Sequence, residues 1–314
     1  MKIEIRNANP APAPAVSIVL PEHLEQYQGM FADLKQSRYL DWPSHIHIET
    51  YALCNAACSF CPYPQLGRQG EKMPDELIDK ILGDLADIPS DLPIQISPFK
   101  VNEPFLDVRL FDILNSINQR LPNASITLTT NATPLNDENL RRLESVRNVG
   151  DLWVSFNDHR SEHYEKVMQL PYARTIARLD ALHARKQSGV LPFNVVLSRV
   201  GDGSAADAEF CGWVAQHYPG FGVSVIPRGA WLGQVDIGMQ VAIPRVGCVR
   251  WFEISITASG VVAHCCMDGQ AAFPIGDASK QHVLDIYNSP HYRALRENAL
   301  TRMEASPCNK CSFM

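Results

Sequence analysis

Three cysteines lie close together in CxxxCxxC spacing: Cys54, Cys58 and Cys61. Cysteine thiolates are the usual ligands of iron–sulfur clusters, and one loop that carries three of them can hold three irons of a 4Fe–4S cluster. The fourth iron would then stay open, so that it could bind and reduce a cofactor. The alternatives are a zinc knuckle and three buried thiols, but zinc normally takes four ligands in two close pairs.

A second set of cysteines lies near the C-terminal end of the sequence. Cys248 is followed by Gly260 and Cys265, and a CxxC pair, Cys308 and Cys311, completes the set. Four thiolates would ligate a second 4Fe–4S cluster completely, so we expect this site to pass an electron or tune a potential rather than bind substrate. A tetrathiolate zinc site is the alternative.

Length, composition and charge restrict the class of protein. The 314 residues allow two or three domains, and 46% hydrophobic with 20% charged residues excludes a disordered chain. The net charge of −6 argues against general binding to nucleic acid or to an anionic membrane surface. We find neither a transmembrane run nor a signal peptide, and expect a cytoplasmic protein in which disulfides are disfavoured.

Strand and helix patterns alternate along most of the chain. Strands are predicted at 46–54, 94–100, 125–132, 151–157, 192–200 and 222–229, and helices at 73–87, 109–121, 136–145, 171–189 and 207–218, with Asn136 as a helix cap. Such alternation predicts a parallel sheet of right-handed βαβ units. Six units are too few for an eight-fold barrel and favour a partial (β/α)6 TIM-like barrel, with its site at the carboxyl ends of the strands.

The pattern changes at both ends of this barrel. Residues 247–268 predict a β-hairpin around the turn 257–260, and 289–302 predict a closing helix with Ser289 as its cap. One amphipathic helix is predicted at 23–40, after an extended Pro/Ala-rich start. We therefore predict an N-terminal extension (1–45), a barrel (46–235) and a small α+β domain (240–314).

The first cysteine set resembles the signature of the radical S-adenosylmethionine (SAM) superfamily, CxxxCxΦC, with Phe60 at the aromatic position. The resemblance continues at the strand ends. Glu103 and Pro104 match the end of the family's GGEP motif, which contacts the amino group of SAM, although Val101 and Asn102 replace its glycines. Thr130 and Asn131 resemble the family's TNG segment near SAM, and Ser155 ends the fourth strand, where members often place a serine near the SAM carboxylate.

The second cysteine set resembles the auxiliary-cluster domain called twitch, the short form of the SPASM domain. The family's GxxxxC spacing favours Cys265 over its neighbour Cys266 as the ligand. Cys266 would then be either a packed residue or a hydrogen-atom donor. Since no cysteine follows Cys311, we predict two 4Fe–4S clusters rather than the three of a full SPASM domain.

The resemblance implies reductive cleavage of SAM to a 5′-deoxyadenosyl radical, which abstracts a hydrogen atom from a substrate, with a flavodoxin- or ferredoxin-type reductant. We expect a small polar natural-product intermediate, such as a sugar, cyclitol or amino alcohol, and a two-electron oxidation by a dehydrogenase. The alternatives are an epimerase with Cys266 as hydrogen donor, modification of a ribosomally made peptide, and a non-catalytic iron–sulfur electron carrier.

Three further residues have more than one interpretation. Arg228 follows the sixth strand and is a candidate catalytic residue that could bind a carboxylate, a phosphate or sugar hydroxyls, or be surface charge. His264 could donate a hydrogen bond to the auxiliary cluster or lie on the hairpin surface. Cys211, in an apolar helical stretch, is interpreted as a buried inert thiol.

Overall fold

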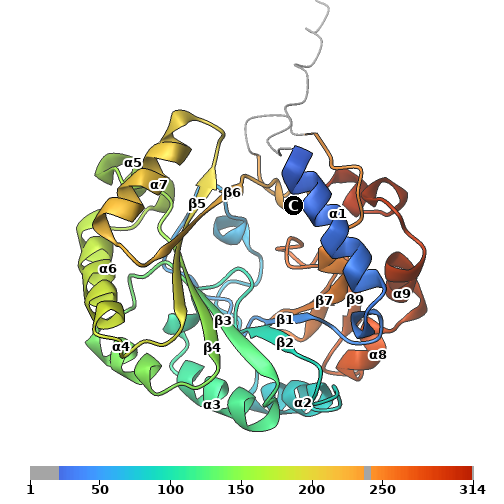
Figure 1. Ribbon diagram of the computed structural model, residues 1–314. Helices are drawn as coiled ribbons and strands as arrows, with labels where there is room; N and C mark the ends of the chain where they lie inside the picture. Colours follow the sequence, from blue (N-terminus) through green and yellow to red (C-terminus); the bar gives the residue numbers. More distant parts are fainter. Residues whose placement is uncertain (1–20, 237–241, 313–314) are drawn as a thin grey trace, which may run out of the picture.

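The computed structural model describes residues 21–236 and 242–312. Six parallel strands follow one another in the sheet in chain order, as the alternation predicts. They are β1 (His45–Ile48), β2 (Ile94–Ser97), β3 (Ala124–Thr130), β4 (Val149–Ser155), β5 (Asn194–Gly201) and β6 (Gly222–Pro227). Figure 1 shows that the sheet curves into an incompletely closed barrel, so the partial barrel is confirmed.

The helices of the barrel cover the outer side of this curved sheet (Figure 1). They are α2 (Asp75–Leu85), α3 (Leu110–Arg120), α4 (Asp137–Glu144), α5 (Ser161–Met168), α6 (Tyr172–Gln187) and α7 (Ala205–His217). Asn136 caps α4, since its Oδ1 accepts from the Asn139 backbone N–H at 2.8 Å. The expectation of five helices is wrong, because α5 adds a second helix between β4 and β5. Cys211 on α7 is half-buried rather than buried.

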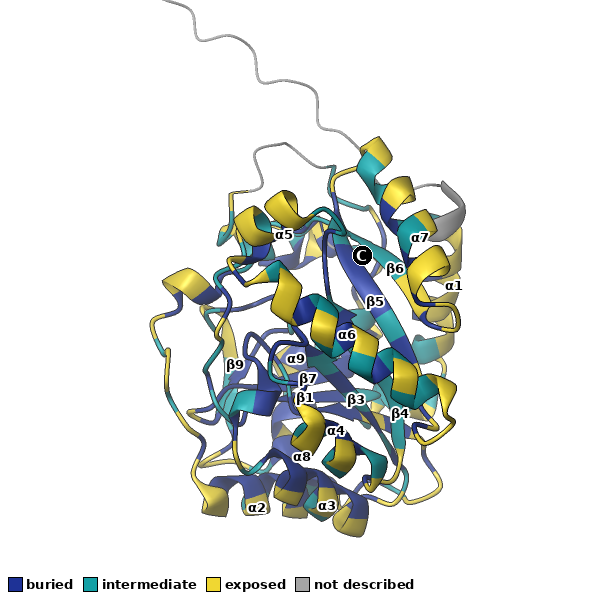
Figure 2. Ribbon diagram, turned by 90° about the vertical axis from the view of Figure 1, so that its left-hand side faces the viewer, coloured by how far each residue is buried: buried dark blue, intermediate teal, exposed yellow. Residues whose placement is uncertain are grey.

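Burial alternates along the strands. On β3, Ile126 and Leu128 are fully buried, whereas Ser125, Thr127 and Thr129 alternate with them and are partly accessible. Side chains of a strand point alternately to its two faces, so the apolar set packs under the helices and the polar set faces the barrel interior. Figure 2 shows buried strands between helices with exposed outer faces. The inner face of β3 is therefore polar.

The C-terminal hairpin continues the barrel sheet. Strand β7 (Glu253–Ile256) pairs parallel with β1, and β8 (Val261–Ala263) and β9 (Pro274–Asp277) follow antiparallel. The turn between β7 and β8 uses Gly260 at φ +88°, which glycine adopts without a steric cost. Helices α8 (Val283–Tyr287) and α9 (Pro290–Glu297) follow. Ser289 precedes α9 as expected, but its side chain makes no capping hydrogen bond.

Helix α1 (Pro21–Lys35) packs against the C-terminal region, on the side of the molecule opposite α6 (Figure 1). The Phe31 ring contacts Trp251 and Phe252 edge-on, with centroids 5.7 and 5.9 Å apart. The predicted helix over 23–40 is too long, since α1 ends at Lys35 and a separate 3₁₀ turn spans Arg38–Leu40. The predicted extended start (1–20) lies outside the described residues. The division into three domains stays a prediction.

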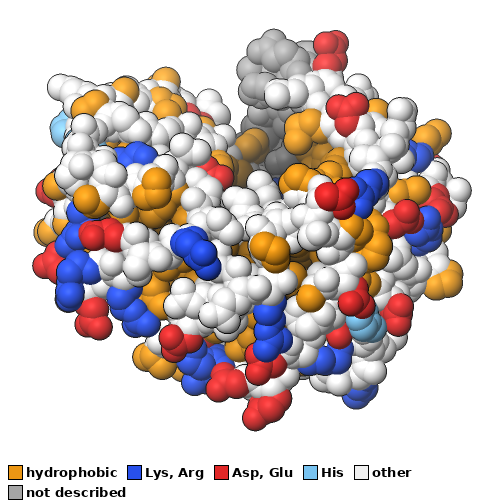
Figure 3. All heavy atoms as spheres, turned by 60° about the horizontal axis from the view of Figure 1, so that its bottom comes forward, with side chains coloured by type: hydrophobic (Ala, Val, Ile, Leu, Met, Phe, Trp, Pro, Cys, Tyr) orange, Lys and Arg blue, Asp and Glu red, His pale blue; other side chains and the backbone are white. Residues whose placement is uncertain are grey.

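Short 3₁₀ turns connect many of these elements. Besides Arg38–Leu40 they span Tyr63–Gln65, Pro104–Leu106, Trp231–Gly233, Val249–Phe252, Arg302–Glu304 and Cys308–Lys310. Figure 3 shows one face of the molecule, on which basic and acidic side chains are interspersed. Every helix in the described ranges is too short or too polar to cross a membrane.

Candidate active site and auxiliary cysteine site

The loop after β1 carries Cys54, Cys58 and Cys61, all half-buried. Backbone N–H groups donate to two of the sulfurs, from Ala56 to Cys54 at 3.4 Å and from Tyr63 to Cys61 at 3.5 Å. Burial raises the pKa of Cys54 to about 12 and that of Cys61 to about 11, and the nearby Glu103 carboxyl and Cys61 thiol raise the Cys54 pKa further. Such crowded thiols become thiolates when a positive metal centre compensates their charge, so the donor set fits an iron–sulfur cluster.

Two distant elements fix the shape of this cysteine loop. The C-terminal end of α5 lies against it, because Ala57 N–H donates to the Met168 carbonyl at 3.3 Å and the Cys58 thiol lies 3.6 Å from Met168 Sδ. Trp231, after β6, donates its indole N–H to the Phe60 carbonyl at 2.9 Å. The Phe60 side chain itself is buried. The sequence motif therefore depends on contacts that its spacing does not reveal.

Glu103 is buried at the end of the loop after β2. Its carboxylate accepts from Thr130 Oγ1 at 2.8 Å, from the Asn131 backbone N–H at 2.6 Å and from the Phe105 backbone N–H at 3.3 Å. Burial raises the pKa of Glu103 to about 7 despite these donors. Two carboxylate oxygens offer about four lone pairs, so one acceptor position is left for a ligand.

The side chain of Asn131 connects the end of β3 to the cysteine loop. Asn131 Nδ2 donates to Asn55 Oδ1 at 2.8 Å, and Asn55 Nδ2 donates to Thr133 Oγ1 at 2.7 Å. Asn55 stands directly after Cys54 in the sequence. The predicted residues Glu103, Thr130 and Asn131 thus come together beside the cysteine loop, and Asn55 and Thr133 are additions that the motif comparison missed.

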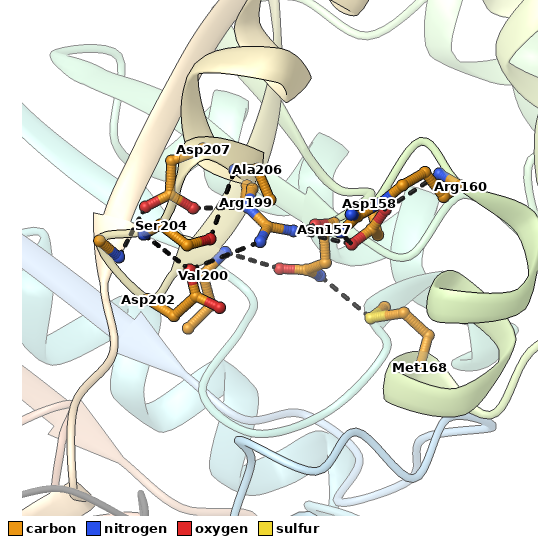
Figure 4. A network of polar contacts seen from close by, with 11 residues as sticks. Asn157, Asp158, Arg160, Met168, Arg199, Val200, Asp202, Ser204, Ala206 and Asp207 are labelled. Atoms are coloured by element: carbon orange, nitrogen blue, oxygen red, sulfur yellow. Dashed lines mark hydrogen bonds and ion pairs between the residues drawn. The ribbon is translucent and has the colours of Figure 1, made fainter.

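Ser155 lies further along the strand ends, where Asn157 orients it. Asn157 Nδ2 lies 2.7 Å from Ser155 Oγ and 3.0 Å from Met168 Sδ, and its Oδ1 accepts from Val200 N–H at 2.8 Å. Figure 4 shows Asn157 between Met168 and Val200. Its backbone adopts φ +65°, a left-handed conformation that asparagine tolerates better than most residues. Asn157 therefore connects Ser155, through Met168, to the cysteine loop.

An ion-pair network stiffens the ends of β4 and β5 behind Asn157 (Figure 4). Arg199 is buried and pairs with Asp158 at 3.0 Å and with Asp207 at 2.7 Å. Arg160 pairs with the same Asp158 at 2.8 Å. The charged groups of this network are paired with one another. The network therefore supports the site and does not offer a charged group to a ligand.

The C-terminal cysteines form the second site. Cys248, Cys265, Cys308 and Cys311 all line one small cavity, and Cys266 does not. Burial raises the pKa of Cys308 to about 12, and burial with neighbouring thiols raises that of Cys265. Four thiols around one cavity form a complete ligand set for a 4Fe–4S cluster, so the residues fit that group.

Side-chain donors surround the sulfurs of this cavity. Trp251 Nε1 donates to Cys308 Sγ at 3.2 Å, and His264 Nε2 lies 3.1 Å from the same sulfur. His264 is buried, which corrects the alternative that it lies on the hairpin surface, and burial lowers its pKa to about 4. Tyr27, on α1, lies with its hydroxyl 3.5 Å from Cys248 Sγ.

Cys266 lies between the barrel and the auxiliary cavity. The carbonyls of Cys265 and Cys266 accept from Lys100 Nζ at 3.2 and 3.4 Å, and Lys100 also bonds Ser255 Oγ on β7. Burial lowers the pKa of Lys100. Lys100 stands three residues before Glu103, so the loop after β2 contacts both cysteine sites.

Arg228 stands just after β6, and its side chain is half-buried. Its Nε is buried and makes no hydrogen bond to the residues that the structure describes. A buried guanidinium N–H without a partner is costly, because it loses its hydration. Arg228 therefore has donor capacity to offer a ligand at the strand ends.

Comparison with protein families identifies the chain. The model of the radical SAM superfamily matches residues 48–207, just over half of the sequence. This chain belongs to the radical SAM superfamily. A second model, the SPASM iron–sulfur cluster-binding domain, matches residues 248–312. This radical SAM enzyme therefore uses SAM with a 4Fe–4S cluster, and its SPASM region implies auxiliary iron–sulfur binding.

Solved structures share the fold at low sequence identity. BtrN in complex with AdoMet and 2-DOIA matches with a TM-score of 0.57 at 18% identity, covering 85% of this chain and 92% of BtrN. SuiB from Streptococcus suis, bound to its precursor peptide SuiA, matches with 0.58 at 15% identity, covering 99% and 78%. AnSMEcpe with bound AdoMet matches with 0.54 at 12% identity, covering 82% of each chain. No curated protein sequence matches the chain.

Proposed function

We propose that this radical SAM enzyme oxidises a small polar substrate, such as a sugar, cyclitol or amino alcohol, by two electrons. The polar inner face of the barrel carries this proposal. His47, Ser97 and Thr127 come from three neighbouring strands and alternate with apolar residues under the helices. A hydroxyl-rich substrate finds hydrogen-bond partners on such a surface, whereas an apolar substrate would leave them unpaired.

The residues of the proposed site fall into three groups. Three cysteines of the loop after β1 would hold the first cluster, and the four that line the C-terminal cavity would hold the second. Phe60, Glu103, Thr130, Asn131 and Ser155 would line the SAM site. Arg228 would bind a carboxylate, phosphate or hydroxyl oxygen of the substrate through its unpaired N–H.

The chain positions these groups for hydrogen abstraction and electron removal. When bound, SAM and its cluster supply the radical that abstracts a hydrogen atom, and the auxiliary cluster supplies a one-electron acceptor. Glu103 accepts a hydrogen bond from the amino group of SAM and so fixes its orientation. The balanced outcome is loss of one hydrogen atom, one electron and one proton from the substrate. The electron needed to start the reaction would come from a flavodoxin- or ferredoxin-type protein.

Epimerisation is the second candidate, and the position of Cys266 favours it. The thiol of Cys266 stays outside the lining of the auxiliary cavity, so it is left over when four cysteines ligate the cluster. A thiol there would return a hydrogen atom to the opposite face of the substrate, and one electron from the auxiliary cluster with one proton would convert the resulting Cys266 thiyl radical back to the thiol, the cluster being reduced again by the flavodoxin- or ferredoxin-type protein. In this case the product keeps all its hydrogen atoms and differs from the substrate only in configuration.

Peptide modification is the third candidate. Its support is the similarity in fold to SuiB bound to SuiA and to anSMEcpe bound to the Cp18Cys peptide. The similarity to BtrN with AdoMet and 2-DOIA, a small molecule, supports the first two candidates. Since all these chains are below 25% identical to this one, the substrate class has to be tested directly.

The test is product analysis with the holoenzyme in D₂O. The reduced enzyme is incubated with SAM and panels of aminocyclitols, sugars and short peptides, and 5′-deoxyadenosine and product masses are measured. Oxidation is expected to remove two hydrogen atoms per SAM cleaved from a panel sugar or cyclitol. Retention of the hydrogen count with uptake of one deuterium, abolished in Cys266→Ala, would establish epimerisation instead. Turnover of peptides alone would overturn the proposed substrate class.

A further inference from the structure

A second cluster of metal-ligating side chains lies outside both cysteine sites. His45 and His47 stand two residues apart on β1, and therefore on the same face of the strand. Glu253 on β7 lies directly beside His45, because the two strands pair in parallel register. One ligand atom from each of the three residues lies within 4.8 Å of the other two.

The surroundings orient these side chains without satisfying them completely. His47 Nε2 lies 3.1 Å from Glu253 Oε2, while Arg250 Nη1 donates to the other carboxylate oxygen at 2.7 Å. Ser97 Oγ lies 2.8 Å from His45 Nε2. His47 is 7% exposed, and its Nδ1 has no hydrogen-bond partner within the described part of the chain. The atom that His47 would offer to a metal is Nε2, which faces Glu253, and not this Nδ1.

We propose that His45, His47 and Glu253 bind a divalent transition-metal ion such as Zn²⁺. Two imidazoles and one carboxylate are a recurrent ligand set for zinc and non-haem iron, and three protein ligands leave a position open for water or a substrate oxygen. With bond lengths of about 2.0–2.1 Å, two ligands of a tetrahedral zinc stand about 3.3 Å apart. The 3.1 Å between His47 Nε2 and Glu253 Oε2 is close to this separation.

Two of the three ligands have contacts of the kind expected of an outer shell. Arg250 holds the carboxylate oxygen that faces away from His47, and Ser97 can fix the ring of His45. The site also differs chemically from the cysteine sites, since it offers only nitrogen and oxygen. It lies on the face of β1 and β7 opposite the buried Ile46 and Ile48, the inner face of the barrel sheet. The proposal stands whichever reaction the enzyme catalyses.

The test uses zinc as the probe on the holoenzyme with its iron–sulfur clusters reconstituted. The protein is treated with a mild chelator, equilibrated with micromolar ZnCl₂ and desalted, and zinc and iron are measured together. About one zinc per chain is expected in the wild type. His45→Gln and His47→Gln should each lose at least nine-tenths of it with unchanged iron, and His217→Gln, an exposed histidine on α7, should retain it.

X-ray absorption at the zinc edge of the wild-type protein identifies the atoms bound to zinc. It tests the proposed site even if a histidine variant fails to fold. Nitrogen and oxygen neighbours at about 2.0–2.1 Å are expected in the wild type, whereas zinc bound in a cysteine site would show sulfur at about 2.3 Å. Sulfur neighbours, zinc retained in both histidine variants, or no zinc in the wild type would each overturn the site.

Discussion

The two cysteine sites of this molecule differ in what holds their sulfur atoms. At the first site, three half-buried thiols lie on one loop, and backbone N–H groups donate to two of them, Cys54 and Cys61. At the second, four cysteines from separate segments line one cavity, and the side chains of Tyr27, Trp251 and His264 reach their sulfurs. The first site has fewer ligands and more exposure, whereas three of the four cysteines of the second site are buried.

This difference matches the two tasks that we propose. A cluster that binds SAM needs an open side and polar groups beside it, and Glu103 and Asn131 lie there. A cluster that only exchanges electrons benefits from enclosure, because burial and hydrogen bonds to sulfur set its potential. The comparison therefore predicts that changes at the first site affect SAM chemistry, whereas changes at the second affect electron transfer.

The largest effect is expected from removing the ligands of the first site. Cys54→Ala/Cys58→Ala/Cys61→Ala should lower the iron content from about eight to about four atoms per chain and abolish SAM cleavage. Anaerobic iron and sulfide analysis with a 5′-deoxyadenosine assay measures both. If the wild type holds four irons and the triple variant none, the C-terminal cysteines do not bind a cluster. The role of electron acceptor would then be lost as well.

Met168→Ala should weaken the first cysteine site and leave the second unchanged, because it removes a side chain that packs beside the first. Met168 is buried and touches both Cys58 and Asn157, so truncation should destabilise this region by about 2–5 kcal/mol. We expect partial loss of iron from the first site only, measured together with the thermal midpoint of the holoenzyme. Met168→Leu, which nearly conserves volume, is the control. An alanine variant with wild-type iron and stability would show that α5 does not support the loop.

Glu103→Gln tests the SAM side of the first site. The amino group of SAM favours the ionised carboxylate, so binding must release the proton that Glu103 holds below its pKa of about 7. The affinity of the wild type for SAM should therefore rise between pH 5.5 and 7. The slope of the logarithm of this affinity against pH should exceed that of Glu103→Gln by one proton released per SAM bound.

At pH 7.5 the glutamine variant should bind SAM roughly 10- to 100-fold more weakly, because a charge-assisted hydrogen bond is lost. Calorimetry on the holoenzyme provides both results, and Glu138→Gln, on the outer helix α4, is the control. Equal pH slopes for wild type and Glu103→Gln would remove Glu103 from the SAM site.

The sequence was most informative where chemistry depends on spacing along one segment. The cysteine motifs, the period-two strands and the amphipathic helices are local patterns, and they predicted the barrel and the candidate ligands. Helix α5 escaped prediction because only Tyr164 and Met168 of its eight residues are buried, which leaves too weak an apolar stripe.

Contacts between distant segments could not be predicted. The pairing of β7 with β1 brings Glu253 beside His45, and no periodicity in either strand specifies its partner. In the same way, Tyr27 reaches Cys248 only because Phe31 anchors α1 on Trp251. Side-chain packing decides such placements, whereas a single sequence records only the residues that take part.

The smallest effect is expected at the second site, where a hydrogen-bond donor to a cysteine sulfur can be removed while all four cysteine ligands stay in place. Tyr27→Phe removes the hydroxyl near Cys248, a hydroxyl that also accepts from Val249 N–H at 3.1 Å and from Arg302 Nη2 at 2.9 Å, and leaves the ring in place. Iron content and SAM cleavage should stay unchanged, and the midpoint potential of the auxiliary cluster should become lower, since a donor no longer stabilises the reduced, more negative state. A redox titration followed by electron paramagnetic resonance measures this shift. Tyr39→Phe, whose hydroxyl instead donates to the Pro93 carbonyl, is the matched control. If Tyr27→Phe moved the potential of the SAM-binding cluster instead, the assignment of the two sites to separate tasks would be wrong.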